Sequence, residues 1–247
     1  FASYWTSTET YEALRSYIDI DFDGMKNVII RLIAGERIGI DIASFGNDMT
    51  TFKSKDDVLT LLIHLGYLGY DPVSKQTFIP NEEIRGEFIT SINVSHWDEV
   101  TAAISNSEAL LDATLRKDAE AVAHAIDKVH SDTTSILTYN NENSLSCVIS
   151  LAYYSARNYY TIVREMPSGK GFADMVFIPY KNINMPAIVA ELKWNSSADA
   201  AIEQIRSKNY TDALKGYSGD IILVVINYDM TTKKHSCVIE SFGHKAN

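Results

Sequence analysis

The run "PAIVAELKW", residues 186–194, places two opposite charges near the end of a segment that otherwise reads as a buried strand. Side chains alternate along a strand, so residues two apart share a face of the sheet. Glu191 and Lys193 therefore follow Val189 toward the interior. Burying either charge without a partner costs on the order of several kcal/mol. Something must accordingly lie close to both charges and compensate them.

The rest of the second half predicts the sheet to which this strand belongs. Apolar positions recur at helical spacing in its first segment and at strand spacing in the next two. Its last long apolar run is continuous, as expected of a strand covered on both faces. The predicted elements are a helix over 142–156, strands over 159–166, 172–180 and 185–194, a helix over 196–216, a strand over 220–229 and an edge strand over 234–242. The core order α-β-β-β-α-β predicts an α/β (α+β) fold with helices packed on one sheet.

The first half reads as mostly helical. An N-terminal helix begins after capping residues, and residues 107–130 contain two further amphipathic helices. Between them, residues 56–89 read as helix, β-hairpin and helix, with Asn81 as the expected N-cap of the second helix. This winged-helix-like order is compatible with a packing module or with a surface that contacts another macromolecule. A polar stretch follows, so we expect a helical domain over 1–135 and a second domain over 136–247.

The acidic charge of the chain is confined to its first half. The 247 residues carry a formal net charge of −10. Residues 1–130 hold 11 Lys and Arg against 21 Asp and Glu, whereas residues 131–247 hold 11 of each. A neutral second half neither excludes nor favours a polyanionic substrate. The acidic first half admits a further hypothesis, in which it mimics nucleic acid or docks a basic partner.

Cysteine use and hydropathy indicate a cytoplasmic protein. Cys147 and Cys237 are the only cysteines, and both lie in apolar segments, so buried thiols are expected rather than a disulfide framework. No stretch approaches the roughly 18 uninterrupted apolar residues that a membrane span requires. We therefore expect no membrane partner.

Three acidic residues interrupt the apolar stripes of adjoining core elements. Glu142 lies on the first helix of the second half, Asp174 on its second strand and Glu191 on its third. Carboxylates at one edge of a sheet repel one another unless a cation joins them, and oxygen ligands select Mg²⁺ or Mn²⁺ rather than zinc. Such an ion polarises a phosphoryl oxygen and lowers the pKa of bound water. Lys193 shares the face of Glu191 and is suited to stabilise charge that develops on a phosphate.

These residues carry a resemblance to a known family. Asp174 is followed, at the end of the next predicted strand, by Glu191-Leu192-Lys193. On an α-β-β-β-α-β core, this pattern resembles the PD-(D/E)XK nuclease superfamily. The resemblance implies a restriction-endonuclease-like core. Gln204 and Tyr210, six residues apart on the following helix, match a Q-x5-Y pattern. That pattern is similar to a subgroup of nuclease-like domains found behind AAA-ATPase-like domains in bacterial proteins. Residues 1–135, notably 61–71 and 78–88, are similar to the segment that ends the ATPase-like part.

The resemblance implies a role for each matching residue. Asp174 and Glu191 would bind the metal ion, and Lys193 would assist the nucleophilic water. Glu142 would be an auxiliary acid that joins the metal site, and Gln204 would orient the site or contact the substrate.

Other positions match or depart from the subgroup. Glu165 matches a common acidic position. Leu145 and Ser146 stand where the subgroup often has an aromatic residue and a histidine, and Phe172 stands where it often has arginine. Losing a histidine and an arginine near a phosphate site weakens the case for turnover.

The leading hypothesis is a Mg²⁺- or Mn²⁺-dependent phosphodiesterase of nuclease type that acts on nucleic acid, with DNA favoured over RNA. The resemblance also implies an upstream ATPase-like domain as a partner. The alternative is a catalytically inactive, nuclease-derived module that binds nucleic acid or a protein.

Overall fold

The computed structural model divides the chain into two compact units, Phe1–Thr101 and Ala102–Asn247. It describes residues 18, 24–45, 52–133, 142–168, 171–195, 214, 217 and 219–242. The predicted N-terminal helix, apart from Ile18, and nearly all of the predicted helix over 196–216 lie outside these residues.

The first unit combines helices with a small antiparallel sheet. The sheet order is β1-β3-β2. Its elements are α2 (Met25–Ile33), β1 (Ile38–Gly39), η2 (Ile42–Ser44), α3 (Lys55–His64), β2 (Gly69–Asp71), β3 (Gln76–Phe78) and α4 (Glu82–Val94). The predicted order of helix, hairpin and helix is confirmed by α3, β2, β3 and α4.

Side-chain caps define where the two flanking helices begin. Ser54 and Asp57 form a capping box at the start of α3, in which each side chain accepts the backbone N–H of the other. The Asn81 side chain accepts the Ile84 N–H at 2.9 Å, which confirms the predicted cap of α4.

A buried arginine holds α4 against the end of α2. Arg85 is 6% exposed, and its Nη1 donates to the Leu32 carbonyl at 3.0 Å and to the Ile33 carbonyl at 2.5 Å. The last carbonyls of a helix lack partners within the helix, and they carry the negative end of its dipole. The guanidinium therefore caps α2 from another helix, 52 residues away in sequence.

The second unit contains a mixed five-stranded sheet with the order β4-β5-β6-β7-β8. Only β6 and β7 are parallel, and every other neighbouring pair is antiparallel. The helix α5 (Asp98–Ser105) spans the division between the units. The elements that follow are α6 (Ser107–Leu115), α7 (Ala119–Thr133), α8 (Glu142–Ala152), η3 (Tyr154–Asn158), β4 (Tyr160–Ser168), β5 (Gly171–Pro179), β6 (Ala187–Trp194), β7 (Ile221–Asp229) and β8 (Lys234–Phe242). The predicted mixed α/β fold is confirmed, and the described helix α8 and strands β4 to β8 follow the predicted order along the chain.

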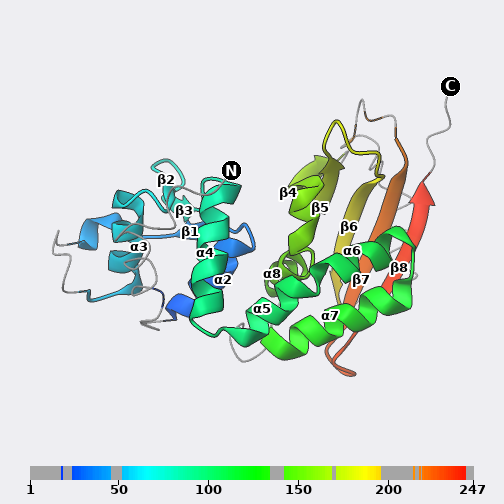
Figure 1. Cartoon of the computed structure of the whole chain (residues 1–247), viewed down its shortest axis with the longest axis horizontal. Helices are drawn as coiled ribbons and strands as arrows, with labels where there is room; N and C mark the ends of the chain where they lie inside the picture. The colour runs from blue at the N-terminus through cyan, green and yellow to red at the C-terminus, as the bar shows by residue number, and fades with distance from the viewer. Residues whose placement is uncertain are drawn as a thin grey trace. The chain divides into compact units, whose positions relative to one another are not determined.

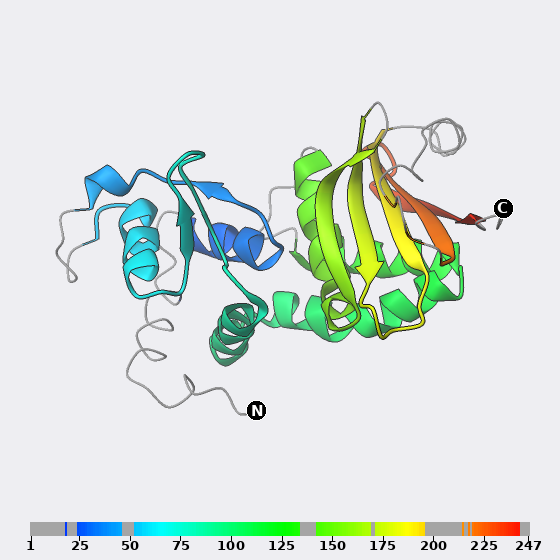
Figure 2. The ribbon, with the colours of Figure 1, turned by 90° about the horizontal axis from the view of Figure 1, so that it is seen from above.

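Helices α6, α7 and α8 line one face of this sheet in both views (Figure 1 and Figure 2). The ring of Tyr228 on β7 meets His130 of α7, with ring centres 5.0 Å apart, so even-numbered β7 residues face these helices. Val189, Leu223 and Val225 belong to a buried cluster that also contains Leu214, and they lie on the opposite face. The face of Val189 is also that of Glu191 and Lys193.

The compact units divide at 101/102, whereas the sequence suggested domains that meet at 135/136. The difference arises because α6 packs on α7 and η3, while α7 packs on β8 and α8. Both helices therefore belong to the body that contains the five-stranded sheet.

Candidate functional site

The strands β5 and β6 separate at the position of the two predicted metal ligands. Their antiparallel pairing runs from Phe177↔Ile188 to Met175↔Ala190 and stops there, although both strands continue. Asp174 is the next residue of β5 and Glu191 is the next residue of β6, so both lie where this ladder ends. We call this region the β5–β6 split, defined by Asp174, Glu191 and the residues that follow on β6.

Asp174 takes the place of a backbone acceptor in the split. Its side chain is half-buried, and Oδ2 accepts the backbone N–H of Leu192 at 2.7 Å. In a regular ladder a carbonyl of β5 would accept from β6 at this position. The carboxylate is therefore held between the strands by a hydrogen bond to the backbone of the E-x-K segment. The chain pattern alone gave no signal for this contact.

Glu191 and Lys193 meet each other on the face opposite α8. The Glu191 residue is 1% exposed, and Lys193 Nζ lies 3.1 Å from its Oε2. The lysine side chain is 16% exposed, so its end reaches toward the surface. The two charges, for which the sequence predicted a metal ion and a substrate as partners, thus compensate each other in part.

The remaining predicted residues are distributed over other elements. Glu142 is the first residue of α8, and its side chain is outside the described atoms. Gln204 and Tyr210 also lie outside the described residues. Glu165 lies on β4 with an exposed side chain and a φ of 50°, and it is skipped in the pairing of β4 with β5. These residues keep the status of predictions.

The three positions that depart from the subgroup pattern have distinct environments. Leu145 is fully buried in α8. The adjacent Ser146 accepts a hydrogen bond from Arg164 Nη2 at 2.8 Å. Phe172 is 59% exposed on β5. Arg164 was not singled out from sequence, although it is a cation in an otherwise mostly apolar stretch of β4.

A second polar cluster, also missed from sequence, joins α7 to β8. His235 contacts Asp127 Oδ1 twice, through its backbone N–H at 2.8 Å and through its ring Nδ1 at 2.7 Å. Burial lowers the pKa of His235, and together with the charge of His235 it lowers the pKa of His130 to about 4. Both histidines are buried, whereas His124 of the same helix as His130 is exposed.

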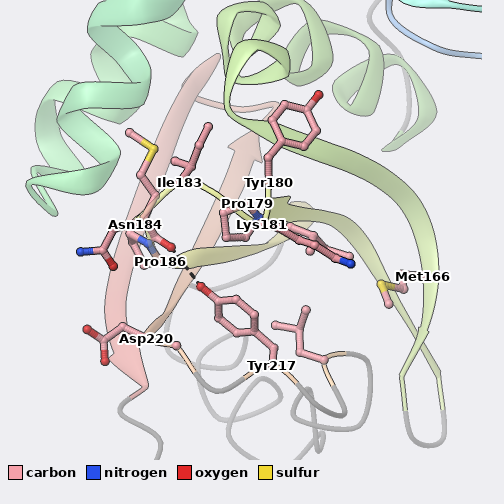
Figure 3. A pocket seen from close by; sticks show the side chains of 13 residues that line it. Met166, Pro179, Tyr180, Lys181, Ile183, Asn184, Pro186, Tyr217 and Asp220 are labelled. Carbon is pink, nitrogen blue, oxygen red and sulfur yellow. Dashed lines mark hydrogen bonds between the residues drawn. The ribbon is translucent and has the colours of Figure 1, made fainter.

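A groove of about 800 Å³ lies over the connection between β5 and β6 (Figure 3). Tyr217 spans it and donates its hydroxyl hydrogen to the Met185 carbonyl at 2.9 Å. Its described lining includes none of the residues of the β5–β6 split. It consists of Met166, Ile178, Pro179, Tyr180, Lys181, Ile183, Asn184, Met185, Pro186, Leu214, Tyr217, Gly219 and Asp220.

The donor set of the split fits a hard divalent ion. Asp174 and Glu191 offer carboxylate oxygens from adjacent strands at the point where their pairing ends. Mg²⁺ is usually held by about one or two carboxylates, with water and substrate phosphate completing the shell. Within the described parts of the chain, no group of three or more His, Cys, Asp or Glu side chains is arranged to hold a metal. The split therefore fits a magnesium site in which the protein supplies one or two carboxylates, rather than a site in which protein side chains supply all the ligands.

Residues 140–237 match a family model described as the PD-(D/E)XK nuclease superfamily. This range begins just before α8 and extends into β8, so it covers the helix and strands that form the split. The match supports the superfamily for this part of the chain. Among curated proteins, none matches the sequence. In the part of the chain that the structure describes, every helix is too short or too polar to cross a membrane.

Proposed function

We propose that the second unit is a divalent-metal-dependent phosphodiesterase of nuclease type that acts on nucleic acid. One observation carries this proposal: where the pairing of β5 with β6 ends, Asp174 accepts the backbone N–H of Leu192, the residue between Glu191 and Lys193. The family match over 140–237 supports the same chemistry.

Each residue of the split has a defined task in this proposal. Asp174 and Glu191 would hold Mg²⁺ or Mn²⁺, which when bound polarises a phosphoryl oxygen and lowers the pKa of bound water. The Leu192 N–H orients the Asp174 carboxylate before any substrate arrives. Lys193 would move its ammonium from Glu191 to a phosphate oxygen and stabilise the negative charge that develops there.

The outer parts of the site are extensions of this proposal. Glu142 would serve as an auxiliary acid and Gln204 as an orienting amide. The similarity of residues 1–135 to the end of an ATPase-like domain points to a parent protein in which an ATPase-like domain accompanies the nuclease unit.

The test combines metal binding with cleavage. Labelled single- and double-stranded DNA and RNA would be incubated with Mg²⁺, Mn²⁺ or EDTA, using wild type, Asp174→Ala, Glu191→Ala and the control Glu240→Ala on β8. We expect metal-dependent cutting that both site variants abolish and the control retains. Unchanged divalent-metal binding by both site variants in calorimetry would refute the metal site.

A second candidate function is an inactive module that binds nucleic acid or a protein. The Lys193–Glu191 ion pair favours it, because the buried carboxylate already has a cationic partner. In this case the wild type would bind labelled nucleic acid with the same affinity in EDTA and in Mg²⁺, without cutting. A metal-dependent increase in affinity that Glu191→Gln removes would count against the inactive module.

A further inference from the structure

The last four residues of β6 pair with a single neighbouring strand in the described part of the chain. Their pairing with β5 has ended at Ala190, whereas pairing with β7 continues from Glu191 to Trp194. A strand paired on one side only has fewer backbone hydrogen bonds to fix its position. Glu191 and Lys193 lie on this segment, so side-chain contacts at its end bear directly on the β5–β6 split.

A row of three rings crosses the sheet at the end of this segment. Trp194 pairs with Tyr228 on β7, and Tyr228 pairs with His235 on β8. The ring centres of Trp194 and Tyr228 are 4.9 Å apart, and those of Tyr228 and His235 are also 4.9 Å apart. Such distances are typical of rings in direct contact. We call these three residues the ring row.

Helix α7 holds the far end of the ring row. The His130 ring packs against Tyr228 and His235, with ring centres 5.0 Å and 5.3 Å away. Asp127 accepts the backbone N–H of His235 at 2.8 Å and contacts its ring Nδ1 at 2.7 Å. Because His130, Tyr228 and His235 are all buried, the row anchors Trp194 to the core.

The residue that follows Trp194 is tied to the same strand. Asn195 donates its N–H to the Tyr228 carbonyl at 2.8 Å, and its Oδ1 accepts the Met230 N–H at 2.8 Å. The chain is therefore fixed immediately beyond Lys193. Alternation places the Trp194 ring on the face covered by α7 and the Lys193 side chain on the opposite face. A shift of the indole would consequently move the backbone that carries the lysine.

We propose that Trp194 is a positioning residue for the nuclease site: its contact with Tyr228 sets the place of Glu191 and Lys193 in the β5–β6 split. The inference rests on the proposed function, because it takes these two residues as a metal ligand and a phosphate contact. A displacement of about 1 Å in a reacting group can lower a rate on the order of a hundred-fold. Residues that support metal ligands from outside typically change metal affinity or activity by about 10- to 100-fold.

The experiment compares Trp194→Leu with Trp194→Phe in the whole chain. Leucine keeps an apolar side chain without a ring, whereas phenylalanine keeps a ring against Tyr228. In calorimetry with Mn²⁺, we expect about ten-fold weaker binding by Trp194→Leu and an affinity within about two-fold of wild type for Trp194→Phe. Tyr228→Leu removes the same contact from β7 and should repeat the loss, which keeps the test decisive if Trp194→Leu fails to fold.

The matched control is Tyr160→Leu. It removes a buried ring whose centre lies 6.2 Å from that of Phe177, and Tyr160 pairs with Pro179 at the end of β5 away from the split. This control should lower the urea midpoint and leave the Mn²⁺ affinity unchanged. Equal weakening of Mn²⁺ binding by Tyr160→Leu and Trp194→Leu would overturn the inference, because the effect would then reflect stability alone.

Hydrogen exchange of the metal-free protein adds a readout that does not depend on metal binding. Trp194→Leu should speed amide exchange in residues 191–195, and Tyr160→Leu should leave that segment as in wild type. Unchanged exchange and unchanged Mn²⁺ affinity in Trp194→Leu would overturn the inference. Failure of the proposed function is a different result: wild type would bind no Mn²⁺, while the exchange rates would still show whether Trp194 fixes the end of β6.

Discussion

Replacing Lys193 by methionine tests the electrostatic balance of the β5–β6 split. The substitution keeps an unbranched apolar stem and removes the ammonium that lies 3.1 Å from Glu191 Oε2. The carboxylate is 1% exposed, and in this variant it loses the ammonium of Lys193. Breaking a buried pair by removing one partner costs about 3–5 kcal/mol. Because the lysine side chain is 16% exposed, we expect a value near the lower end, about 3 kcal/mol.

A divalent ion should recover much of this loss if Asp174 and Glu191 form a metal site. Ligand binding to the folded state alone stabilises it by about 2.7 kcal/mol when the free ligand is at 100 times its Kd. The double variant Glu191→Gln/Lys193→Met removes both charges, so it should cost less than Lys193→Met alone. It should also gain nothing from Mg²⁺, since one carboxylate ligand is gone.

The assay is urea unfolding in EDTA and in saturating Mg²⁺, followed by tryptophan fluorescence and circular dichroism. Lys181→Met, at an exposed position in the β5–β6 connection, is the control for losing a lysine and should be near neutral. If Lys193→Met were as stable as Lys181→Met, the ion pair would contribute nothing to folding. If Mg²⁺ stabilised the single and double variants equally, the metal would bind elsewhere.

Three further predictions follow from the described contacts. Asp174→Asn keeps an acceptor for the Leu192 N–H and should unfold near the wild-type urea midpoint. Asp174→Ala lacks that acceptor, so its free energy of unfolding should fall by about 1–3 kcal/mol. Both variants should lose metal binding in calorimetry. The folded-state pKa of His130 is depressed to about 4, so the unfolded chain binds more protons below about pH 6.5. The free energy of unfolding should therefore fall by up to about 1.4 kcal/mol per pH unit as the pH drops from 6.5 to 4. Urea unfolding at a series of pH values measures this dependence. It should be shallower in His130→Phe, but not in the exposed control His124→Gln. Arg85→Met removes the cap on α2 and should destabilise the first unit by about 2–3 kcal/mol in thermal unfolding. The control is Arg116→Met, because Arg116 forms only a solvent-exposed ion pair with Asp112 at 4.0 Å. This control should change stability by less than about 0.5 kcal/mol.

Much of the fold was readable from the sequence because its elements are buried in characteristic patterns. β7 is buried at every position from Ile221 to Tyr228, which is why its apolar run is continuous. Asn81 marks the start of α4 because a short polar side chain at that position satisfies a free backbone N–H. By contrast, β1 has only two residues, Ile38 and Gly39, and two residues carry no periodicity.

The boundary between the two units was harder to predict from the sequence, for a physical reason. An amphipathic pattern shows that a helix has an apolar face, but not which element covers that face. Both α6 and α7 have such faces, and α7 directs Val122, Ile126 and Val129 into the core. One contact that joins α7 to β8 is the pair Asp127 and His235, separated by 108 residues. No local pattern contains that information.

Alternation predicted that Glu191 and Lys193 share a face, and their ion pair agrees with it. It could not predict the gap between β5 and β6 or the bond from Leu192 to Asp174, because these depend on where the ladder stops. The helix with Gln204 lies outside the described residues, so that part of the predicted site stays a prediction.

The Lys193–Glu191 pair is where the two candidate functions diverge. In a metal-dependent enzyme the lysine must leave Glu191 when a phosphate binds. Breaking this ion pair is favourable only if another cation then pairs with the buried carboxylate. Metal and nucleic acid would then each favour binding of the other, because each removes part of the cost that the other would bear alone. In a binding module the pair persists, and the two ligands are independent. Mg²⁺ should therefore tighten nucleic-acid binding in the enzyme, and the Glu191→Gln variant should lose that coupling.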